Sequence, residues 1–319
     1  EEEPANLDIY AIAAAAHNSG GKVIFQVRGM VPRHSMKARE VRIPGALVDA
    51  VVVDETQQQG YEVVYDAALS GQKRREGFAQ PEPLFSSRLV IARRAQQELY
   101  DNAVINFGFG IPDQIAKLID HDGKSARYFQ TIEHGTYGGR LMDGDLFGYA
   151  MNPSCMIDGP SQFDFYSGGG LDIAFLGFGE IDAVGNVNVS KLGGNTVGPG
   201  GFIDIAQNAR KVVFCGTFDT GGARTEVGSG VMRVTEHGRI SKLVDKVDQI
   251  TFSGPQSLLQ GQKVIYITER AVFELRENGL HIIEIAPGID LQTDLLDRMG
   301  FVPNMNSPLS EMDSNYFKK

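Results

Sequence analysis

Short segments that are apolar along nearly their whole length recur through most of the chain. They are AVINFG, YFQTIE, LDIAFLGFG, KVVFCGT, KVIYIT and GLHIIEIA. Strands without polar alternation are typical of sheets covered on both faces, as parallel sheets between helices are. Helices are expected between them over residues 88–100 (capped by Ser86 or Ser87), 112–120 and 291–299 (capped by Asp290). The pattern predicts an α/β fold with an open, mostly parallel sheet flanked by helices.

The distribution of polar and apolar residues divides the chain into four segments. Residues 1–54 contain two strand-like stretches, KVIFQV and ALVDAVVVD, after a helix that begins near Leu7. Residues 55–87 are polar, with QQQ and the basic cluster KRR, and are expected to form a solvated linker. Residues 88–303 hold the alternation of strands and helices, and the polar residues 304–319 are expected to be a loosely held tail.

The charge balance and the cysteine content exclude several classes of partner. Lysine and arginine number 30 against 40 aspartates and glutamates, which gives a net charge of −10. Binding to a phosphate backbone requires the opposite balance, so we expect no nucleic-acid partner. There is no apolar run of about 18 residues and no export signal, so we expect no membrane association. The two cysteines, Cys155 and Cys215, favour a cytoplasmic protein without structural disulfides.

Glycine is enriched: 38 of the 319 residues are glycine, about 12% against a usual share of about 7%. Only seven glycines precede Arg88, so the enrichment lies in the segment 88–303. Clusters flank the apolar strands at Gly108 and Gly110; Gly135, Gly138 and Gly139; Gly168, Gly169 and Gly170; and Gly198, Gly200 and Gly201. Two interpretations are open, tight turns at positive φ or ligand-binding loops along one edge of the sheet. No complete dinucleotide or P-loop fingerprint is present.

Glu133 is the candidate nucleophile, because it ends the strand YFQTIE and precedes the glycine-rich turn HGTYGG. A carboxylate is ionised at neutral pH and can attack an activated acyl group such as a thioester without a general base. Backbone N–H groups in nearby glycine loops would stabilise the oxyanion that forms. The alternative is a glutamate at a strand end that is solvated or caps the next helix.

At these residues the sequence resembles a family I coenzyme A transferase. The resemblance rests on INFGFGIP, QTIEHGTYGG, GGGLDIAFLGFGEIDAVGNVNVSKL, GPGGFIDIAQNARKVVF, ITERAVFEL and GLHIIEIAPGI, which occur in the family's order. They cover nearly all of residues 88–303, which would be the β-half of the enzyme. Upstream, GGKVIFQVRG and IPGALVDAVVV resemble the end of the α-half. Residues 1–54 would then be the tail of the α-half, and the remaining N-terminal part of that half would be a partner absent from this sequence.

The resemblance implies a ping-pong transfer of coenzyme A (CoA) between a thioester and free carboxylates. Glu133 would form first an acyl-glutamyl anhydride and then a glutamyl-CoA thioester. The backbone of Gly201 and Gly200 would bind the oxyanions, and Gly108, Gly110, Gly168, Gly169 and Gly170 would line the CoA site. The CoA thioester is a substrate, and no tightly bound cofactor is expected. The motif IEHG departs from the SENG of the ketoacid branch and is closer to the acetate/propionate branch, whose substrates are short-chain carboxylates.

Two other functions stay open from the sequence. A thioester hydrolase would use the same site with water as the acceptor, and a non-catalytic effector-binding module would share the fold alone. The acidic pairs beside histidines, Asp120 and Asp122 at His121 and Glu236 at His237, lack a spaced set of further ligands, so no metal site is expected. His134 is expected to have a structural role, and the enzyme is expected to be a homo-oligomer.

Overall fold

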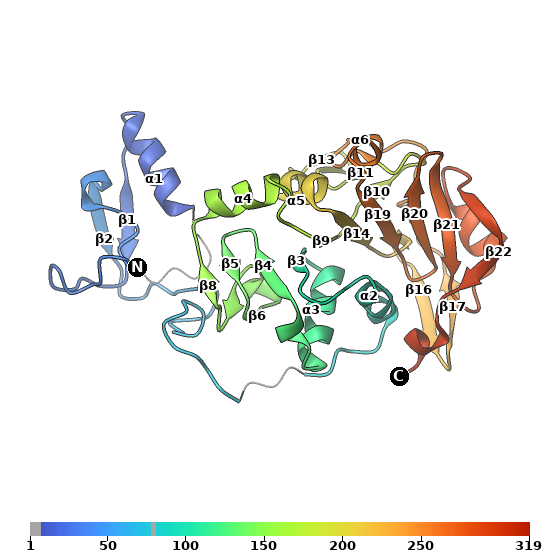
Figure 1. Cartoon of the computed structure of the whole chain (residues 1–319), viewed down its shortest axis with the longest axis horizontal. Coiled ribbons are helices and arrows are strands. Elements are labelled where there is room, and N and C mark those ends of the chain that lie inside the picture. The colour runs from blue at the N-terminus through green and yellow to red at the C-terminus, as the bar shows by residue number, and fades with distance from the viewer. Residues whose placement is uncertain (1–7, 78–80) are drawn as a thin grey trace. The chain divides into compact units, whose positions relative to one another are not determined.

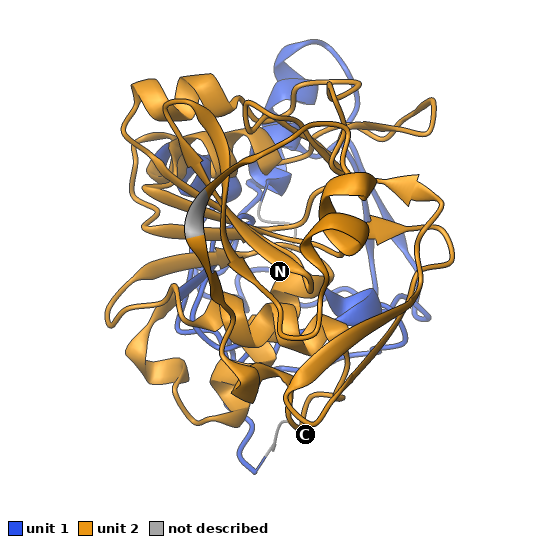
Figure 2. Cartoon of the chain, turned by 90° about the vertical axis from the view of Figure 1, so that its right-hand side faces the viewer, with its two compact units in different colours: residues 1–78, 130–164 blue, residues 79–129, 165–319 orange. Residues whose placement is uncertain are grey.

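The structure is a computed structural model that describes residues 8–77 and 81–319 (Figure 1). The chain forms two compact units, one of residues 1–78 and 130–164 and the other of residues 79–129 and 165–319 (Figure 2). They are called unit 1 and unit 2. Leu7, expected in the first helix, and residues 78–80 of the expected linker lie outside the described residues.

Unit 2 contains the predicted sheet, with the strand order β22-β21-β20-β19-β14-β9-β3. The four strands β3, β9, β14 and β19 are mutually parallel. Their neighbours β20 and β21 form an antiparallel hairpin, and β22 runs parallel to β21. The bounds are β3 Val104–Phe107, β9 Ile173–Leu176, β14 Lys211–Cys215, β19 Lys263–Ile267, β20 Ala271–Arg276, β21 Gly279–Ile285 and β22 Asn304–Glu311. The expected open and mostly parallel α/β sheet is therefore confirmed.

The central strands are apolar on both sides because both sides are buried. Phe175 of β9 and Phe214 of β14 are fully buried. Phe107 of β3 stacks on Phe175 with ring centroids 5.3 Å apart, and Phe214 stacks on Tyr266 of β19 at 5.2 Å. Aromatic contacts between neighbouring strands add to the burial of apolar area and hold the register of the sheet.

Two helices of unit 2 are capped by serine, and the cap at Ser86 agrees with the sequence-based expectation. Ser86 accepts a hydrogen bond from the N–H of Leu89 and caps α2 (Ser87–Gln96), and Ser253 caps α6 (Gly254–Leu259) in the same way. The other helices are α3 (Ile111–His121) and α5 (Phe202–Asn208), while α4 (Gly159–Ser167) contains the division between the units. The guanidinium of Arg94 joins α2 to β21 through two bonds to Glu284, of 2.9 and 2.7 Å.

Short antiparallel pairs complete unit 2. They are β10 (Glu180–Ile181) with β11 (Val187–Asn188), β12 (Lys191–Leu192) with β13 (Asn195–Thr196), β15 (Asp219–Thr220) with β18 (Ile240–Ser241), and β16 (Arg224–Gly228) with β17 (Val231–Glu236). A 3-10 turn, Ser125–Arg127, precedes the strand β4 (Phe129–Ile132).

The C-terminal residues differ from the sequence-based expectation. Residues 304–319 were expected to be loosely held, but β22 pairs with β21, and Phe317 in the 3-10 turn Ser314–Phe317 is fully buried. An edge strand is held by backbone hydrogen bonds, which leave no apolar pattern in the sequence. The helix expected over residues 291–299 is a π turn (Leu291–Leu295) followed by a 3-10 turn (Leu296–Arg298), and Asp290 caps it as predicted.

Unit 1 is smaller, and its described residues include two small cores. The helix α1 (Ile9–Asn18) packs through Ala13 against Val23 and Ile43, beside β1 (Ile24–Val27) and its parallel partner β2 (Ala50–Val53). The second core contains Ala68, Leu69 and Met151, so part of the segment expected to be a solvated linker is packed. The strands of its second part are β4 (Phe129–Ile132), β5 (Thr136–Tyr137), β6 (Arg140–Leu141), β7 (Ala150–Met151) and β8 (Cys155–Met156).

Candidate functional site

Glu133 lies in the tight turn between β4 and β5. The strands are antiparallel, with Ile132 opposite Thr136, so the turn consists of residues 133–135. The N–H of Gly135 closes it with a 2.9 Å bond to the carbonyl oxygen of Ile132. The Glu133 side chain is half-buried. The carboxylate therefore sits on a short, hydrogen-bonded hairpin whose first strand is buried over its last three residues.

Gly135 is required by both conformation and space. Its φ is +105°, a region that residues with a Cβ rarely adopt. A Cβ at this position would overlap the backbone carbonyl of Ile157, which follows β8. The N–H of Ile157 in turn donates a 2.8 Å bond to the Gly135 carbonyl oxygen. The turn that carries Glu133 is thus held by its own hydrogen bond to Ile132 and by the packing of Gly135 against Ile157. This restricts the positions that the Glu133 side chain can reach.

His134 occupies the middle of the same turn and not a strand face. Its imidazole packs close to Gly148, where a Cβ would lie 3.3 Å from the ring carbon Cε1. Among the described residues, neither His134 Nδ1 nor the nearby Thr136 Oγ1 has a hydrogen-bond partner, although both atoms are buried. The packing of the ring fits the structural role expected for His134. Packing alone does not explain the buried Nδ1, because buried polar atoms usually have a hydrogen-bond partner.

Four of the glycines assigned to CoA binding in unit 2 use their N–H groups inside the fold. Gly108 donates to the Phe175 carbonyl at 2.8 Å, and Gly110 donates to Asp113 Oδ2 at 3.3 Å at the start of α3. Gly169, at φ +83°, and Gly170 donate to the carbonyls of Tyr166 and Phe165 and close the end of α4. This is the hydrogen-bond pattern of a Schellman motif. These N–H groups are not free to bind a ligand.

The loop of residues 198–201 differs in this respect. Gly201 is the N-cap of α5 with φ −76°, and Gly200 is exposed with φ +54°. In the described part of unit 2, the N–H groups of Gly200 and Gly201 donate no hydrogen bond. Unpartnered N–H groups at a glycine turn are the donors that an oxyanion needs.

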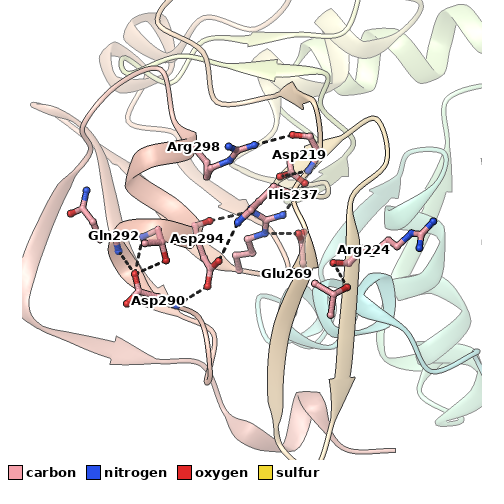
Figure 3. Close-up of polar contacts among 12 residues, drawn as sticks. Asp219, Arg224, His237, Glu269, Asp290, Gln292, Asp294 and Arg298 are labelled. Carbon is pink, nitrogen blue, oxygen red and sulfur yellow. Dashed lines mark hydrogen bonds and ion pairs between the residues drawn. The ribbon is translucent and has the colours of Figure 1, made fainter.

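A buried ionic cluster that the sequence analysis missed lies at the ends of β14 and β19 (Figure 3). Arg270 is fully buried, and its Nη2 bonds Asp219 Oδ1 at 2.8 Å while its Nε lies 3.3 Å from Glu269 Oε1. The second oxygen of Glu269 accepts the N–H of Phe218 at 2.9 Å. Burial raises the pKa of Glu269, and the charge of Arg270 opposes that shift. The signal in the sequence is the pair Glu-Arg directly after an apolar strand.

A cavity of about 400 Å³ lies beside this cluster and is lined in part by Asp219, Arg239 and Arg298. Arg298 donates to the Gly238 carbonyl at 3.1 Å, and Arg239 donates to the Gly221 carbonyl at 3.0 Å. The walls therefore carry charges of both signs, and the guanidinium groups are held by backbone carbonyls.

Comparison with known proteins places the chain in a family. No family model matches it. The acetate CoA-transferase YdiF of Escherichia coli O157:H7 is 43% identical over 318 residues, which are 99% of this chain and 60% of that protein. Its crystal structures include the apoenzyme, with a TM-score of 0.90 and 44% identity over 99% of this chain and 60% of that one, and a thioester complex with CoA. The chain belongs to the family I coenzyme A transferases.

Two further relatives show what share of a complete enzyme or subunit the chain covers. The caffeate CoA-transferase of Acetobacterium woodii is 42% identical over 326 residues, covering 100% of this chain and 62% of that protein. The acetate CoA-transferase subunit beta of Haemophilus influenzae is 27% identical over 221 residues, covering 65% of this chain and 87% of that subunit. The chain thus spans about three fifths of the length of YdiF and of the caffeate enzyme.

The residues that the family resemblance assigns fall in both units. Glu133 belongs to unit 1, whereas Gly108, Gly110, Gly168, Gly169, Gly170, Gly200 and Gly201 belong to unit 2. Within unit 2, the first pair lies on the loop after β3, the next three at the end of α4, and the last pair at the start of α5.

The acidic residues beside histidines are engaged in other contacts. Asp122 pairs with Lys124 at 2.7 Å, Asp120 accepts from Ser125, and Glu236 lies 3.3 Å from Arg224. His237 Nε2 lies 3.5 Å from Asp294 Oδ1 (Figure 3). Within residues 8–77 and 81–319, no three or more His, Cys, Asp or Glu side chains are grouped to hold a metal ion. In the same residues, no helix is both long and apolar enough to cross a membrane.

Proposed function

We propose that this chain carries the nucleophile of an acyl-CoA:carboxylate CoA-transferase that exchanges short-chain acids of the acetate and propionate class. The similarity to an acetate CoA-transferase over 99% of the chain carries the proposal. The turn of residues 133–135 supports it, because Gly135 and the Ile157 carbonyl restrict the backbone of Glu133. A carboxylate held in place loses less freedom when it attacks a substrate.

The first half-reaction moves CoA from the donor to Glu133. A carboxylate oxygen of Glu133 attacks the thioester carbonyl carbon, the C–S bond breaks, and CoA leaves as a thiolate. The thiolate then attacks the Glu133 carbonyl carbon of the acyl-glutamyl anhydride. The bond from that carbon to the bridging oxygen breaks, the first acid leaves as a carboxylate, and a glutamyl-CoA thioester remains.

The second half-reaction is the reverse with a new acid. The acceptor carboxylate attacks the glutamyl-CoA carbonyl carbon, the thiolate leaves, and it attacks the acyl carbon of the new anhydride. The products are the new acyl-CoA and the Glu133 carboxylate, with no net uptake of water or protons. Each tetrahedral intermediate carries an oxyanion, and the free N–H groups of Gly201 and Gly200 are the donors that we assign to it.

A further part of the enzyme is proposed to cover the parallel pair β1 and β2. All four residues of β2 are exposed, with Val52 and Val53 at 50%, and Ile24 of β1 is 65% exposed. Parallel strands are normally covered on both faces. The α-half of the transferase is the proposed cover, and the activity experiments below therefore use the full-length protein.

We also propose that the enzyme is a cytoplasmic homo-oligomer. Its two free thiols, Cys155 and Cys215, fit a reducing compartment.

The test is mass spectrometry of the full-length protein after incubation with acetyl-CoA, together with transfer kinetics. A CoA adduct on the peptide that contains Glu133 is expected, and Glu133→Gln should lower transfer by about 10⁴-fold or more because it removes the nucleophile. Glu277→Gln is the matched control, since Glu277 also lies in a hairpin turn directly after a strand and is exposed. Transfer that survives Glu133→Gln rules the mechanism out, and steady acetate release without an adduct identifies a thioester hydrolase.

A further inference from the structure

The loops after the parallel strands of unit 2 meet at one edge of its sheet. Because β3, β9 and β14 are parallel, Gly108, Gly177 and Gly216, which follow them, lie at the same edge. The loops are in contact there: a Cβ on Gly177 would lie 3.9 Å from the Phe109 carbonyl oxygen. The ring of Phe178 fills the space beside Gly216, where a Cβ would come within 2.5 Å of it. Ligands of open α/β sheets bind at this edge.

Lys242 brings an unpaired cation to this edge. Its Nζ lies 4.9 Å from the centroid of the Phe178 ring and donates one long hydrogen bond, of 3.4 Å, to the Phe178 carbonyl oxygen. The side chain is half-buried, and within the described residues no carboxylate oxygen lies within ion-pair distance of Nζ. An ammonium group has three donors, so two of them have no protein partner.

Other half-buried lysines of the chain behave differently. Lys117, Lys124, Lys191 and Lys211 each lie 2.7–3.9 Å from a carboxylate oxygen. Burial lowers the pKa of Lys242, and the nearby charge of Arg88 adds to that effect, against the carboxylates of Glu269 and Asp219. A partly desolvated ammonium without a counterion is costly unless an anion binds to it.

Arg88 is a second unpaired cation on the same side of unit 2. It lies in the first turn of α2, and its Nη2 would be 3.7 Å from a Cβ on Gly110 of the loop after β3. In the described part of the chain Arg88 makes no hydrogen bond and no ion pair, and its side chain is exposed. Two cations and a glycine loop thus converge where the Gly108 and Gly110 N–H groups are already used.

We propose that Lys242 and Arg88 bind phosphate groups of the CoA moiety of the substrate. This inference rests on the proposed function, which supplies a ligand with several phosphates. The side-chain cations would then bind the phosphates, because the N–H groups of Gly108 and Gly110 are already used inside the fold. The absence of side chains at these two glycines would let the ligand approach the backbone closely.

The test compares thioester donors that differ in phosphate content, using the full-length protein and its Lys242→Met and Arg88→Met variants. Methionine keeps an apolar stem over Phe178 and removes the charge. The KM for acetyl-CoA should rise about 10-fold in each variant, as expected for one charge-assisted hydrogen bond, with kcat little changed. The KM for acetyl-pantetheine, which has no phosphate, should not change. Lys263→Met is the control, because Lys263 is exposed at the opposite end of β19.

Several outcomes overturn the assignment. An equal rise in KM for acetyl-CoA and acetyl-pantetheine assigns Lys242 to packing, and an unchanged KM for acetyl-CoA in both variants removes both residues from the site. Inorganic phosphate binding that Lys242→Met abolishes, with CoA affinity unchanged, assigns the site to free phosphate. Arg88 is exposed, so its variant keeps the test valid if Lys242→Met does not fold.

Calorimetric binding of CoA separates this inference from the proposed function. CoA that binds the full-length protein, with an affinity that Lys242→Met lowers about 10-fold, supports the phosphate assignment even if no transfer activity is found. Transfer with a Glu133 adduct and no effect of either variant refutes the phosphate assignment alone.

Discussion

The hairpin around Glu133 and the loop of residues 198–201 use glycine in opposite ways. In the hairpin, Gly135 and Gly139 are enclosed by backbone, since a Cβ on either would come within 2.5 Å of a carbonyl oxygen. In the loop, a Cβ on Gly198 or Gly200 would meet nothing within 4 Å. The hairpin therefore uses glycine for close packing of the backbone around Glu133. The loop has open space at Gly198 and Gly200, and the N–H groups of Gly200 and Gly201, unlike that of Gly198, donate no hydrogen bond in the described part of unit 2.

The difference shows that a cluster of glycines does not by itself define a binding loop. N–H groups without a partner in the fold are the first candidates for binding a ligand. Among the described residues, those of Gly200 and Gly201 have no partner, whereas those of Gly108, Gly110, Gly169 and Gly170 are used inside the fold. Substitutions of glycine in the hairpin should therefore mainly lower stability, and loss of an N–H group in the loop should mainly lower activity.

Among the glycine substitutions, the largest effect is expected from Gly201→Pro. The native φ of −76° suits proline, and the N–H that proline removes donates no bond in the described part of unit 2. The substitution should lower kcat by about 10²–10³-fold, the cost of losing one oxyanion donor, and should change the melting temperature little. Gly201→Ala keeps the N–H and is the control. Equal activity of the two variants would show that this N–H does not act in the reaction.

Gly135→Ala should mainly destabilise the protein. The strained φ of +105° and the overlap with the Ile157 carbonyl should together cost about 3 kcal/mol or more of unfolding free energy. Denaturant unfolding of the full-length protein measures this value, and Glu133→Gln, which leaves the backbone unchanged, is the comparison. A loss below about 1 kcal/mol would mean that the hairpin relaxes and does not fix Glu133.

The smallest effect is expected from Gly200→Ala. The φ of +54° costs an alanine about 1 kcal/mol, but no atom stands in the way of its Cβ. Unfolding should therefore shift by about a third of the change caused by Gly135→Ala. A loss as large as that of Gly135→Ala would contradict the contrast between an enclosed and an open glycine.

Much of the architecture was predictable from local patterns. Continuous apolar runs gave the central strands of unit 2, and Ser86 and Asp290 marked helical turns, because burial and capping depend on neighbouring residues. The edge strand β22 was not predictable, since its pairing with β21 relies on backbone groups. The packing of Ala68 and Leu69 was missed because this short apolar pair stands in a segment that is polar over most of its length.

The sequence by itself determined the fold class, the place of Glu133 directly after a strand, and the resemblance to family I coenzyme A transferases. The tertiary structure decided which glycine N–H groups donate hydrogen bonds inside the fold and why a side chain at Gly135 is costly. It also revealed that Arg270 meets Asp219 and that Lys242 lacks a carboxylate partner among the described residues. These facts depend on partners such as Ile157, Phe178 and Asp219, which are distant along the chain, so no local pattern contains them.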